Sequence, residues 1–345
     1  MKKIVFTGGG TAGHIYPNLA IAEQLKNWEI HYIGSNGMEK DIVSKFQNII
    51  FHEIECVKFD RSRLIKNFKV PFKLYLSIKQ AKKILKEIKP DIIFSKGGFV
   101  ALPVARAAKK LKIPLITHES DLTLGLANKI IARTACAVCT TFHQTSKISP
   151  SYICTGQPIR ENMFHGDKSK VLTKLRYPNK PIILFVGGSL GSVRMNELLA
   201  EPEYLTGDYC IIHSVGKNNI SSIKPKDSYF PFAYLDPICD YYAAADLVVT
   251  RAGSGVINEL LTLQKPMLML PLSKAASRGD QIENAKLFSK LGYGEMILDE
   301  SLNKQSLKQT IDKMFKNANF YKKNLQKTGK NDANAKIIEL IENFS

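Results

Sequence analysis

Hydrophobic positions along the chain fall into short runs, separated by segments in which apolar residues recur with a helical spacing. The runs are bounded by Gly, Pro or polar residues, which is typical of strands buried on both faces of a parallel sheet. The segments between them have the period of amphipathic crossover helices. We therefore expect an α/β protein with strands at 2–7, 30–34, 91–95, 114–118, 181–186, 246–250 and 266–272.

The same succession of strand, glycine turn and helix occurs twice. The stretch "VFTGGGTAG" at 5–13 resembles "LFVGGSLG" at 184–191, and "DIIFSKGG" at 91–98 resembles "DLVVTRAGSG" at 246–255. The repetition predicts two tandem Rossmann-like domains. All four glycine turns follow the carboxyl ends of strands, which is where open α/β sheets bind ligands.

The length of the chain also suits two domains, because 345 residues exceed what one hydrophobic core usually holds. We place the first domain at 1–157 and the second at 158–330, with parallel sheets that face an interdomain cleft. The remaining segment, 331–345, is expected to form a C-terminal helix that could return to the first domain.

The net charge of +18 is concentrated in the first half of the chain. Residues 1–160 contain 25 Lys and Arg but 11 Asp and Glu, and the segment 61–89 holds ten basic residues and one acidic residue. Such a surface attracts an anionic partner: nucleic acid, acidic lipid or a phosphorylated substrate. Aromatic residues do not interleave the basic run in a stacking pattern, and no RNA- or DNA-binding motif occurs, so we expect no nucleic acid partner.

Composition narrows the class of protein further. Hydrophobic residues make up 44% and charged residues 23%, which is typical of a globular chain. No run of 18 uncharged apolar residues occurs, so we expect neither a membrane span nor a secretory leader. The six cysteines show no paired framework, and we interpret the C-x-x-C at Cys136 and Cys139 as buried thiols in a reducing cytosol.

The first glycine turn raises the question of which ligand it binds. Gly8, Gly10 and Gly13 have the spacing G-x-G-x-x-G, which often marks a dinucleotide site. Such a site needs an acid at the end of the second strand, whereas that strand ends here in Gly34 and Ser35. The missing acid argues against a nicotinamide cofactor. The turn still lets backbone N–H groups at a helix start approach an anion or a polar ligand.

Five ordered motifs resemble one family of enzymes. They are "GGGTAGHIYPNLAIA", "FSKGGFVALP", "HESDLTLGLANK", "FVGGSLGSVRMN" and "TRAGSGVINELLTLQKPMLMLPL…RGDQIENA". They are similar to the motifs of the peptidoglycan glycosyltransferases that add N-acetylglucosamine to undecaprenyl-diphospho-muramoylpentapeptide, lipid I. The resemblance implies a GT-B fold, UDP-N-acetylglucosamine (UDP-GlcNAc) as donor, inversion at the anomeric carbon and lipid II as product. It also implies a peripheral enzyme on the anionic cytoplasmic face of the cell membrane.

The resemblance assigns the donor mainly to the second domain. Ser189 matches a serine that approaches the diphosphate at a helix N-terminus, and Gly253 and Ser254 are expected to act similarly. Glu259 matches the acid that binds the ribose hydroxyls. The alternative for Glu259 is a solvated helix acid without a ligand.

Three further positions match donor-binding residues of the family. Ile238 matches the position whose backbone pairs with uracil, but it could be a plain core residue. Arg160 matches an arginine near the nucleotide, but it could be a solvated surface residue. Gln281 matches a residue that recognises the sugar hydroxyls.

The first domain is expected to hold the lipid acceptor. Thr11, Ala12 and Gly13 match the loop that faces the transferred sugar of UDP-GlcNAc, and many relatives have Gly in place of Ala12. His14 is the candidate nearest the chemistry. A neutral imidazole could take the proton of the attacking 4-hydroxyl, or His14 could only orient the loop and bind phosphate.

The motif "HESDLTLGLANK" supplies the rival base, Glu119, which His118 could orient. Asn128 matches the asparagine later in the same motif and is expected to bind UDP-GlcNAc. Asp121 stands where many relatives have a sugar-contacting Asn, so the resemblance does not extend to that contact. Phe99 stands where some relatives have Tyr, so any hydroxyl role at that position is lost.

Two expectations concern what surrounds the reaction. The chain has no D-x-D sequence, which metal-dependent nucleotide-sugar enzymes often use, so we expect that no metal cofactor is required. Apolar residues recur at helical spacing in 71–89, and the basic, partly apolar stretch "LIKNFKVPFKLYL" at 64–76 could bind an anionic membrane. An epimerase or a glycolipid glycosyltransferase of the same fold would share the donor residues but not the motifs "GGGTAGHIYP" and "HESDLTLGLANK".

Overall fold

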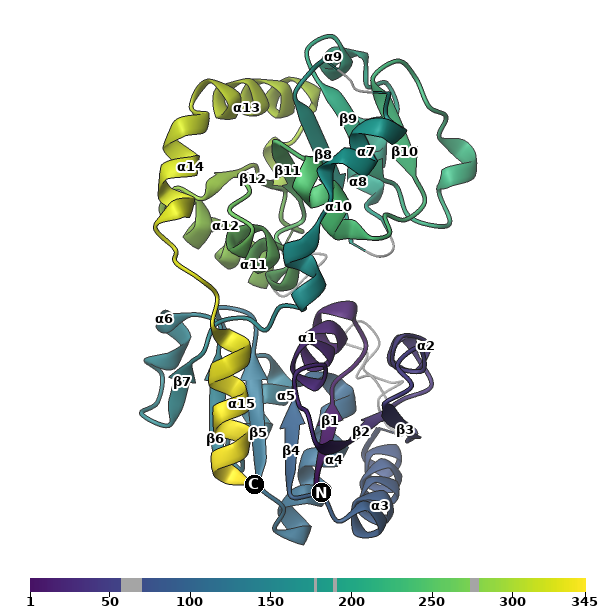
Figure 1. The fold of residues 1–345 in the computed structure, drawn as a ribbon, viewed down its shortest axis with the longest axis vertical. Helices are drawn as coiled ribbons and strands as arrows, with labels where there is room; N and C mark the ends of the chain where they lie inside the picture. The colour runs from purple at the N-terminus through teal and green to yellow at the C-terminus, as the bar shows by residue number, and fades with distance from the viewer. Residues whose placement is uncertain (57–69, 177–178, 189–190, 274–278) are drawn as a thin grey trace. The chain divides into compact units, whose positions relative to one another are not determined.

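The structure is a computed structural model that describes residues 1–56, 70–176, 179–188, 191–273 and 279–345. This part of the chain divides into two compact units (Figure 1). Unit 1 comprises Met1–Arg160 together with Asn331–Ser345, and unit 2 comprises Glu161–Lys330. Each unit is built on its own parallel sheet, as expected from the repeated pattern of strands and glycine turns.

The sheet of unit 1 has seven strands in the order β3-β2-β1-β4-β5-β6-β7, and every recorded pair is parallel. Parallel neighbours need crossover connections, which the helices between the strands provide. The strands are β1 (Lys2–Thr7), β2 (Trp28–Gly34), β3 (Ile49–Glu53), β4 (Ile92–Ser95), β5 (Leu115–Glu119), β6 (Ala137–Thr140) and β7 (Tyr152–Cys154).

Both faces of this sheet are covered, because apolar side chains alternate along its strands. On β1, Ile4 and Phe6 join the core under α1, α2 and α15, whereas Val5 joins the core under α3, α4 and α5. The helices of unit 1 are α1 (Ala12–Ala22), α2 (Met38–Val43), α3 (Val70–Ile88), α4 (Gly98–Leu111), α5 (Leu126–Ile131), α6 (His143–Ser146) and α15 (Ala333–Phe344).

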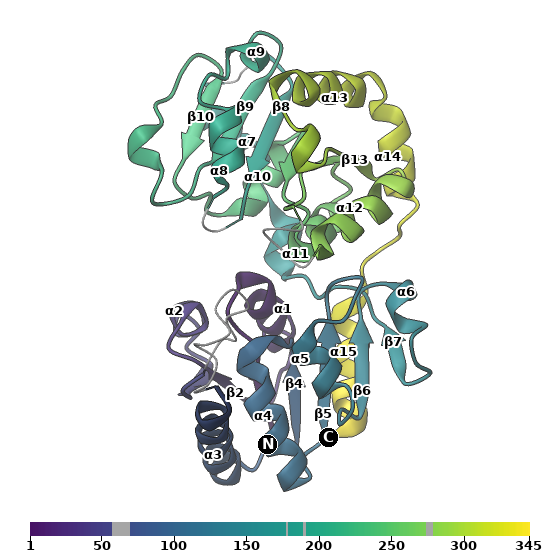
Figure 2. The same cartoon turned by 180° about the vertical axis from the view of Figure 1, so that it is seen from behind.

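The last helix, α15, belongs to unit 1 although unit 2 precedes it in the sequence. It packs on α1 and β4, with Ile337 and Ile341 fully buried in the core, and the views from both sides show it against this sheet (Figures 1 and 2). Lys2 Nζ donates to the carbonyl of Ser345 at 3.2 Å, so the two ends of the chain are neighbours.

Unit 2 has a sheet of six strands in the order β10-β9-β8-β11-β12-β13, again parallel throughout the recorded pairs. One of its faces packs on α8, α13 and α14. Its strands are β8 (Ile182–Val186), β9 (Cys210–Ser214), β10 (Tyr229–Phe232), β11 (Leu247–Thr250), β12 (Met267–Met269) and β13 (Gly294–Met296).

The helices of unit 2 connect these strands, and α13 and α14 follow the last strand. They are η2 (Glu161–His165), α7 (Lys168–Lys174), α8 (Val193–Leu198), α9 (Glu203–Thr206), η3 (Ile220–Ser222), α10 (Ile238–Ala244), α11 (Ser254–Thr262), α12 (Asp280–Lys290), η4 (Asp299–Ser301), α13 (Lys304–Lys316) and α14 (Ala318–Gln326).

The strand orders place a topological switch point in each unit. In unit 1 the chain runs from β1 outward to β2 and β3, and then crosses to β4 on the other side of β1. In unit 2 it runs from β8 outward to β9 and β10, and then crosses to β11. Ligands of open α/β sheets bind at the carboxyl edge of such a point, because the flanking loops diverge there. The four glycine turns noted in the sequence follow β1, β4, β8 and β11.

Two local features complete the fold. Ala81, Leu85 and Ile88 of α3 are buried, which confirms the apolar face predicted for this helix. The six cysteines are free, and Cys139 is buried in β6. The prediction that both thiols of the C-x-x-C are buried is wrong for Cys136. This residue lies just before the first residue of β6 and is exposed.

Candidate functional site

The glycine loop of unit 1 joins β1 to α1 at the carboxyl edge of the sheet. Gly10 has a φ of +82°, in the left-handed region, and a Cβ there would lie 2.6 Å from the Phe99 ring, so only Gly fits without a rearrangement. Thr11 and Gly13 are exposed and Ala12 is half-buried. The end of the loop is therefore accessible to a ligand.

His14 lies in the first turn of α1, and its ring is bonded back to the glycine loop. Nδ1 is 3.0 Å from the carbonyl oxygen of Gly9 and 3.4 Å from Thr11 Oγ1. A carbonyl oxygen can only accept, so the bond to Gly9 requires the proton on Nδ1. The neutral ring then carries its lone pair on Nε2, as a general base requires.

Glu119 ends β5 and is buried, with donors at both carboxylate oxygens. Oε1 accepts from the Asp121 N–H at 3.0 Å, and Oε2 accepts from the Gly125 N–H at 2.8 Å and from Asn128 Nδ2 at 2.9 Å. Asn128 also donates to the main-chain carbonyl of His118 at 3.1 Å. Glu119 and Asn128 thus brace the loop that follows β5.

A buried amine lies next to this loop, at the end of β4. Lys96 is 1% exposed, and its Nζ is 2.6 Å from His118 Nδ1 and 2.7 Å from Ser120 Oγ. Burial lowers the pKa of Lys96 to about 7, and burial together with the nearby Lys96 lowers the pKa of His118 well below 6.5. His118 Nε2 donates to the Gly156 carbonyl at 2.8 Å. The prediction that His118 orients Glu119 is wrong, because both ring nitrogens bond other groups.

Arg160 lies at the end of the first segment of unit 1. Its guanidinium carbon is 4.1 Å from the centre of the Tyr16 ring, a stacking contact on α1 two residues beyond His14. The contact places the charge of Arg160 beside the helix that begins at the glycine loop.

The donor residues expected in unit 2 follow the carboxyl ends of different strands. Gly253 and Ser254 begin α11 after β11, Gln281 lies in the first turn of α12 after β12, and Ile238 is the first residue of α10 after β10. They therefore lie at the ligand-binding edge of the sheet. Ser189 is outside the described residues.

Side-chain contacts connect these elements. Tyr242 of α10 donates its hydroxyl to Glu259 Oε2 of α11 at 3.4 Å, and Glu259 is half-buried. Gln281 Oε1 accepts from the Leu272 N–H at 2.9 Å, which ties α12 to the loop after β12. Glu259 and Gln281 are thus held in place by neighbouring elements of unit 2.

Comparison with known proteins decides the family. Residues 4–140 match the glycosyltransferase family 28 N-terminal domain, and residues 182–341 match the glycosyltransferase family 28 C-terminal domain. The chain is 46% identical, over 99% of its length and 98% of the relative's, to a Clostridium novyi protein. It is 41% identical, over 99% of both chains, to one from Geobacillus thermodenitrificans. Both are named UDP-N-acetylglucosamine–N-acetylmuramyl-(pentapeptide) pyrophosphoryl-undecaprenol N-acetylglucosamine transferase.

The chain belongs to glycosyltransferase family 28. The resemblance drawn from the five motifs is thereby confirmed. The fold agrees as well: the crystal structure of Acinetobacter baumannii MurG is similar with a TM-score of 0.78 and 25% identity, covering 99% of this chain and 100% of that one. The calicheamicin glycosyltransferase CalG4, at 11% identity and a TM-score of 0.73, shares the fold. The predicted GT-B architecture of two parallel-sheet α/β domains is confirmed.

Two residues of unit 1 escaped the sequence analysis although signals for them were present. Glu39 is 1% exposed and accepts from the Gly10 N–H at 3.2 Å and the Ser35 N–H at 3.0 Å. A carboxylate therefore does reach the glycine loop, and it binds the protein's own backbone there. The stretch "GMEKDIV" places this acid in a short helix directly after the second strand. Lys96, in "FSKGG", was equally visible beside a glycine turn.

Arg251 was also missed, at the switch point of unit 2. It directly follows β11, is 8% exposed, and donates from Nη1 to Ser192 Oγ at 3.3 Å, so it connects the glycine turns after β8 and β11. Within the described residues its Nε has no hydrogen-bond partner. Burial lowers the pKa of Arg251, but the ordinary value is so high that the guanidinium stays charged. The sequence signal was the basic residue of "TRAGSG".

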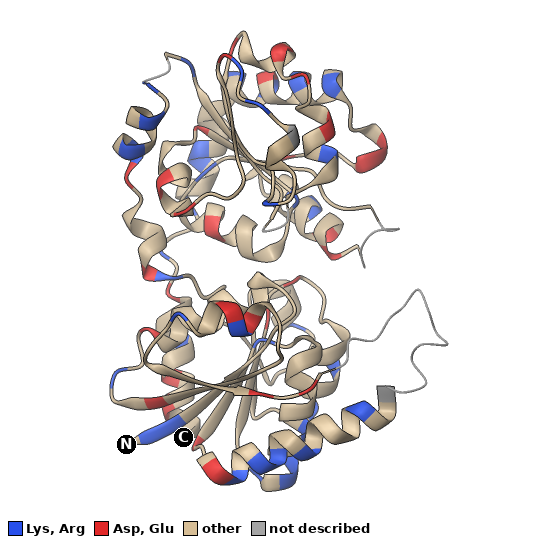
Figure 3. Cartoon of the chain, turned by 90° about the vertical axis from the view of Figure 1, so that its right-hand side faces the viewer, with Lys and Arg blue, Asp and Glu red and all other residues tan. Residues whose placement is uncertain are grey.

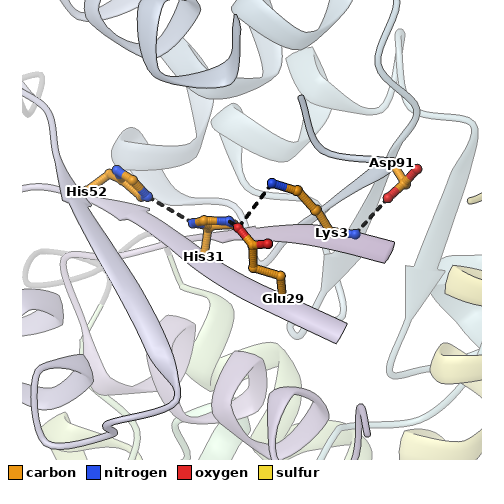
Figure 4. Close-up of polar contacts among 5 residues, drawn as sticks. All are labelled: Lys3, Glu29, His31, His52 and Asp91. Atoms are coloured by element: carbon orange, nitrogen blue, oxygen red, sulfur yellow. Dashed lines mark hydrogen bonds and ion pairs between the residues drawn. The ribbon is translucent and has the colours of Figure 1, made fainter. Parts of the chain in front are cut away.

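A second polar cluster of unit 1 lies away from the glycine loop (Figure 4). His31 Nε2 donates to Glu29 Oε1 at 2.8 Å, His31 Nδ1 is 3.0 Å from His52 Nε2, and Lys3 Nζ donates to Glu29 at 3.2 Å. Burial lowers the pKa of both histidines. Lys3 and Glu29 are the second residues of β1 and β2, at the opposite end of these strands from the loop, so this cluster is separate from the candidate site.

Two properties of the described residues concern membrane and metal binding. No helix in this part of the chain is long and apolar enough to cross a membrane. Among the same residues, no group of three or more His, Cys, Asp and Glu side chains is arranged to hold a metal ion.

Proposed function

We propose that this chain transfers N-acetylglucosamine from UDP-GlcNAc to the 4-hydroxyl of the muramoyl sugar of lipid I, giving lipid II and UDP with inversion. The observation that carries the proposal is the identity of more than two fifths along the whole chain with transferases named for this reaction. The glycine turns of the two units, at switch points of parallel sheets, supply the two ligand-binding edges that a donor and an acceptor require.

We place the donor at unit 2. The N-terminus of α11, with Gly253 and Ser254, favours the diphosphate through its backbone N–H groups and helix dipole, and Arg251 adds a full positive charge. Glu259 then binds the ribose hydroxyls, Ile238 pairs with uracil and Gln281 contacts the sugar. Further contacts with UDP-GlcNAc are expected from Ser189, Arg160 and Asn128, and from Thr11, Ala12 and Gly13 of the first glycine loop.

We assign His14 as the general base. The 4-hydroxyl oxygen forms a bond to the anomeric carbon while the bond from that carbon to the UDP phosphate oxygen breaks, and its electron pair leaves with UDP. The hydroxyl proton passes to Nε2 of His14, the nitrogen that carries the lone pair when Nδ1 donates to Gly9. Glu119 is a poorer candidate, because its carboxylate already accepts three hydrogen bonds within unit 1.

We expect the reaction to proceed without a metal cofactor, since helix N-termini and Arg251 can neutralise the charge that develops on the diphosphate. Activity after exhaustive treatment with EDTA should equal the untreated activity. Loss of activity with EDTA and its return with Mg²⁺ would contradict this expectation.

We infer that the enzyme reaches lipid I by binding peripherally to an anionic membrane through α3. Phe72 and Tyr75, near the start of this helix, are 67% and 62% exposed. Basic residues are distributed along the length of the helix (Figure 3). Exposed aromatic side chains beside lysines favour shallow insertion into anionic bilayers. Lys66 and Lys69, in the basic stretch 64–76, lie outside the described residues.

Vesicle sedimentation tests this membrane assignment. Replacing Phe72 and Tyr75 by Ser, or Lys73 and Lys79 by Glu, should weaken binding to phosphatidylglycerol vesicles at physiological salt. The charge-reversal control is Lys336→Glu, which changes an exposed lysine of α15 and not of α3. Binding that is equally strong in all variants would remove α3 from the proposal.

One assay tests the transfer itself. Incubation with radiolabelled UDP-GlcNAc and a lipid I analogue should give a labelled disaccharide lipid. His14→Gln should lower kcat by about 10²–10⁴-fold, while His143→Gln, an exposed histidine of the same unit, should leave it unchanged. Release of free sugar without an acceptor would favour an epimerase of the same fold instead.

A further inference from the structure

One peptide group of the glycine loop is hydrogen-bonded from both ends. The peptide between Gly9 and Gly10 donates its N–H to Glu39 Oε2 at 3.2 Å and accepts with its C=O from His14 Nδ1 at 3.0 Å. The C=O and N–H of a trans peptide point in opposite directions, so the carboxylate and the imidazole lie on opposite sides of the same amide group. A continuous chain of hydrogen bonds therefore connects Glu39 to His14.

The packing around this peptide leaves little room for another arrangement. A Cβ at Gly9 would lie 2.6 Å from the Glu39 carboxylate. On the other side, a Cβ at Gly98 would lie 2.9 Å from the Gly9 oxygen and 3.1 Å from His14 Nδ1. Two glycines thus let the carboxylate and the imidazole approach the peptide closely.

Glu39 lies in this position as a buried carboxylate held by neutral donors. Its second oxygen accepts from the Ser35 N–H at 3.0 Å and from the Ser35 hydroxyl. Within the described part of the chain, the recorded partners of Glu39 are these groups and the Gly10 N–H, and no ion pair is among them. Neutral donors orient a buried carboxylate without cancelling its charge, so its field is strong at short range.

We propose that Glu39 is a positioning residue for His14, acting through the Gly9–Gly10 peptide. A carboxylate that accepts from the peptide N–H polarises the amide and makes its C=O a better acceptor, because hydrogen bonds in a chain strengthen one another. The stronger bond to Nδ1 holds the ring in one orientation and in the Nδ1–H tautomer, with the lone pair on Nε2. The inference rests on the proposed function, in which Nε2 takes the proton of the acceptor hydroxyl.

The arrangement also favours the charge that the reaction creates. When Nε2 takes the proton, the imidazole becomes a cation whose Nδ1–H still donates to the polarised carbonyl. The carboxylate beyond the peptide stabilises that cation, as the aspartate of a serine-protease triad does by direct contact. Here the Gly9–Gly10 peptide lies between the carboxylate of Glu39 and the imidazole of His14, so it transmits the effect of the acid to the base.

The decisive variant is Glu39→Gln, assayed in the full-length protein. Glutamine is uncharged, and it replaces one of the two carboxylate oxygens by an NH2 group, which cannot accept the hydrogen bond from Ser35 or from Gly10 that this oxygen accepts in the wild type. We expect kcat to fall about 10–100-fold, by analogy with outer partners of other functional histidines, with KM for UDP-GlcNAc within about twofold of the wild type. Asp41→Asn, an exposed carboxylate of the same helix, is the matched control and should leave both parameters unchanged.

The readout that a merely structural role would not change is the tautomer of His14. Nitrogen-15 NMR of ring-labelled histidine, assigned by comparison with His14→Gln, should show the Nδ1–H form in the wild type and in Asp41→Asn. In Glu39→Gln the ring should shift toward the Nε2–H form. If Glu39→Gln does not fold, Glu39→Asp, which withdraws the carboxylate by one methylene, should give the same two changes with smaller amplitude.

Two results would overturn the inference: an unchanged His14 tautomer in a folded Glu39→Gln variant, or a kcat equal to that of the wild type. Failure of the proposed function has a different signature. In that case the wild type forms no disaccharide lipid and His14→Gln is as active as the wild type in any UDP-GlcNAc reaction, whatever the tautomer shows.

Discussion

Two glycines of the first turn differ in what their positions require. Gly10 needs a left-handed backbone and contacts Phe99, so it is a requirement of the fold. Gly13 lies in the first turn of α1, where an added Cβ would meet open space apart from Thr11 Oγ1 at 3.9 Å. The fold does not need glycine at that position. We expect the small size of Gly13 to leave room for the transferred sugar at the exposed surface of the turn.

A pair of alanine variants separates these roles. Gly10→Ala should lower the free energy of unfolding of unit 1 by about 1–3 kcal/mol. Alanine is strained at the left-handed φ of this position, and its methyl group would clash with the Phe99 ring. Gly13→Ala should leave it unchanged or raise it by up to about 1 kcal/mol, since alanine favours the helix. If the sugar lies at this turn, Gly13→Ala raises KM for UDP-GlcNAc all the same. Urea unfolding and steady-state kinetics of both variants provide the comparison.

The buried amine of Lys96 contributes to the dependence of the protein's stability on pH. Burial lowers the pKa of Lys96 to about 7 in the folded protein, against an ordinary value of 10.5. Between these values the unfolded chain binds a proton that the folded chain does not. The folded state therefore gains stability as the pH rises from about 7 toward 10.5, and it is penalised in full below pH 7.

This contribution should disappear in Lys96→Met. The wild type should gain a few kcal/mol of stability relative to Lys96→Met between about pH 6.5 and 9, an order-of-magnitude expectation from the size of the pKa shift. Lys110→Met, on the exposed side of α4, should follow the wild type. Parallel pH profiles of wild type and Lys96→Met in urea unfolding would show that Lys96 keeps its proton in the fold.

At the scale of elements, the ends of the helices show how local sequence sets boundaries. The best example is α13, whose N-cap Asn303 accepts from the Ser306 N–H at 2.9 Å while Ser306 Oγ accepts from the Asn303 N–H at 3.0 Å. Each side chain satisfies a backbone donor that a helix start leaves open. This capping box aligns Leu307 and Ile311 with the core of unit 2.

Removing the cap should therefore cost stability in unit 2. Asn303→Ala is expected to lower the free energy of unfolding by about 1 kcal/mol. Gln309→Ala, an exposed position within the same helix, should change it by no more than a few tenths of a kcal/mol. Chemical denaturation followed by a probe in unit 2 measures the difference. Equal stability of the two variants would mean that other contacts determine where α13 begins.

For the whole molecule, the important feature is that unit 1 is made from two separate segments of the chain. Asn331 donates to the Gln157 carbonyl at 2.9 Å, and Asn334 bonds Ile159 at both its N–H and its C=O, so the two passages between the units are tied together. Beyond them α15 adds Ile337 to the core of unit 1. Unit 1 therefore cannot complete its core until residues 331–345 have returned.

A core substitution in α15 should accordingly weaken unit 1 and leave unit 2 intact. Ile337→Ala is expected to cost about 2–5 kcal/mol and Ile337→Val about 0.5–1.5 kcal/mol. Glu339→Ala, on the exposed face, should cost little. Hydrogen exchange read by mass spectrometry should show faster exchange in β1, β4 and α1 and unchanged protection in unit 2. Uniform loss of protection in both units would contradict this division.

The sequence by itself determined the class of fold, the repeat and the family. Alternation of apolar runs and helical segments is a local property, and the glycine turns are marked by residue type, so both can be read without coordinates. The strands that the pattern did not predict include β3, β7, β10 and β13, which are the edge strands of the two sheets. Their existence depends on a neighbour to pair with.

Only the tertiary structure decided which side chains meet at the candidate site. Glu39 reaches Gly10 because β2 lies beside β1, and Lys96 reaches His118 because β4 lies beside β5. No spacing along the chain encodes such contacts, since strand order and register create them. For the same reason the motif could not show that the carboxylate of Glu119, a candidate base, accepts hydrogen bonds from Asp121, Gly125 and Asn128 of the segment that follows β5. Residue types and local periodicity are written in the sequence, whereas the role of a polar side chain depends on the neighbours that the fold brings to it.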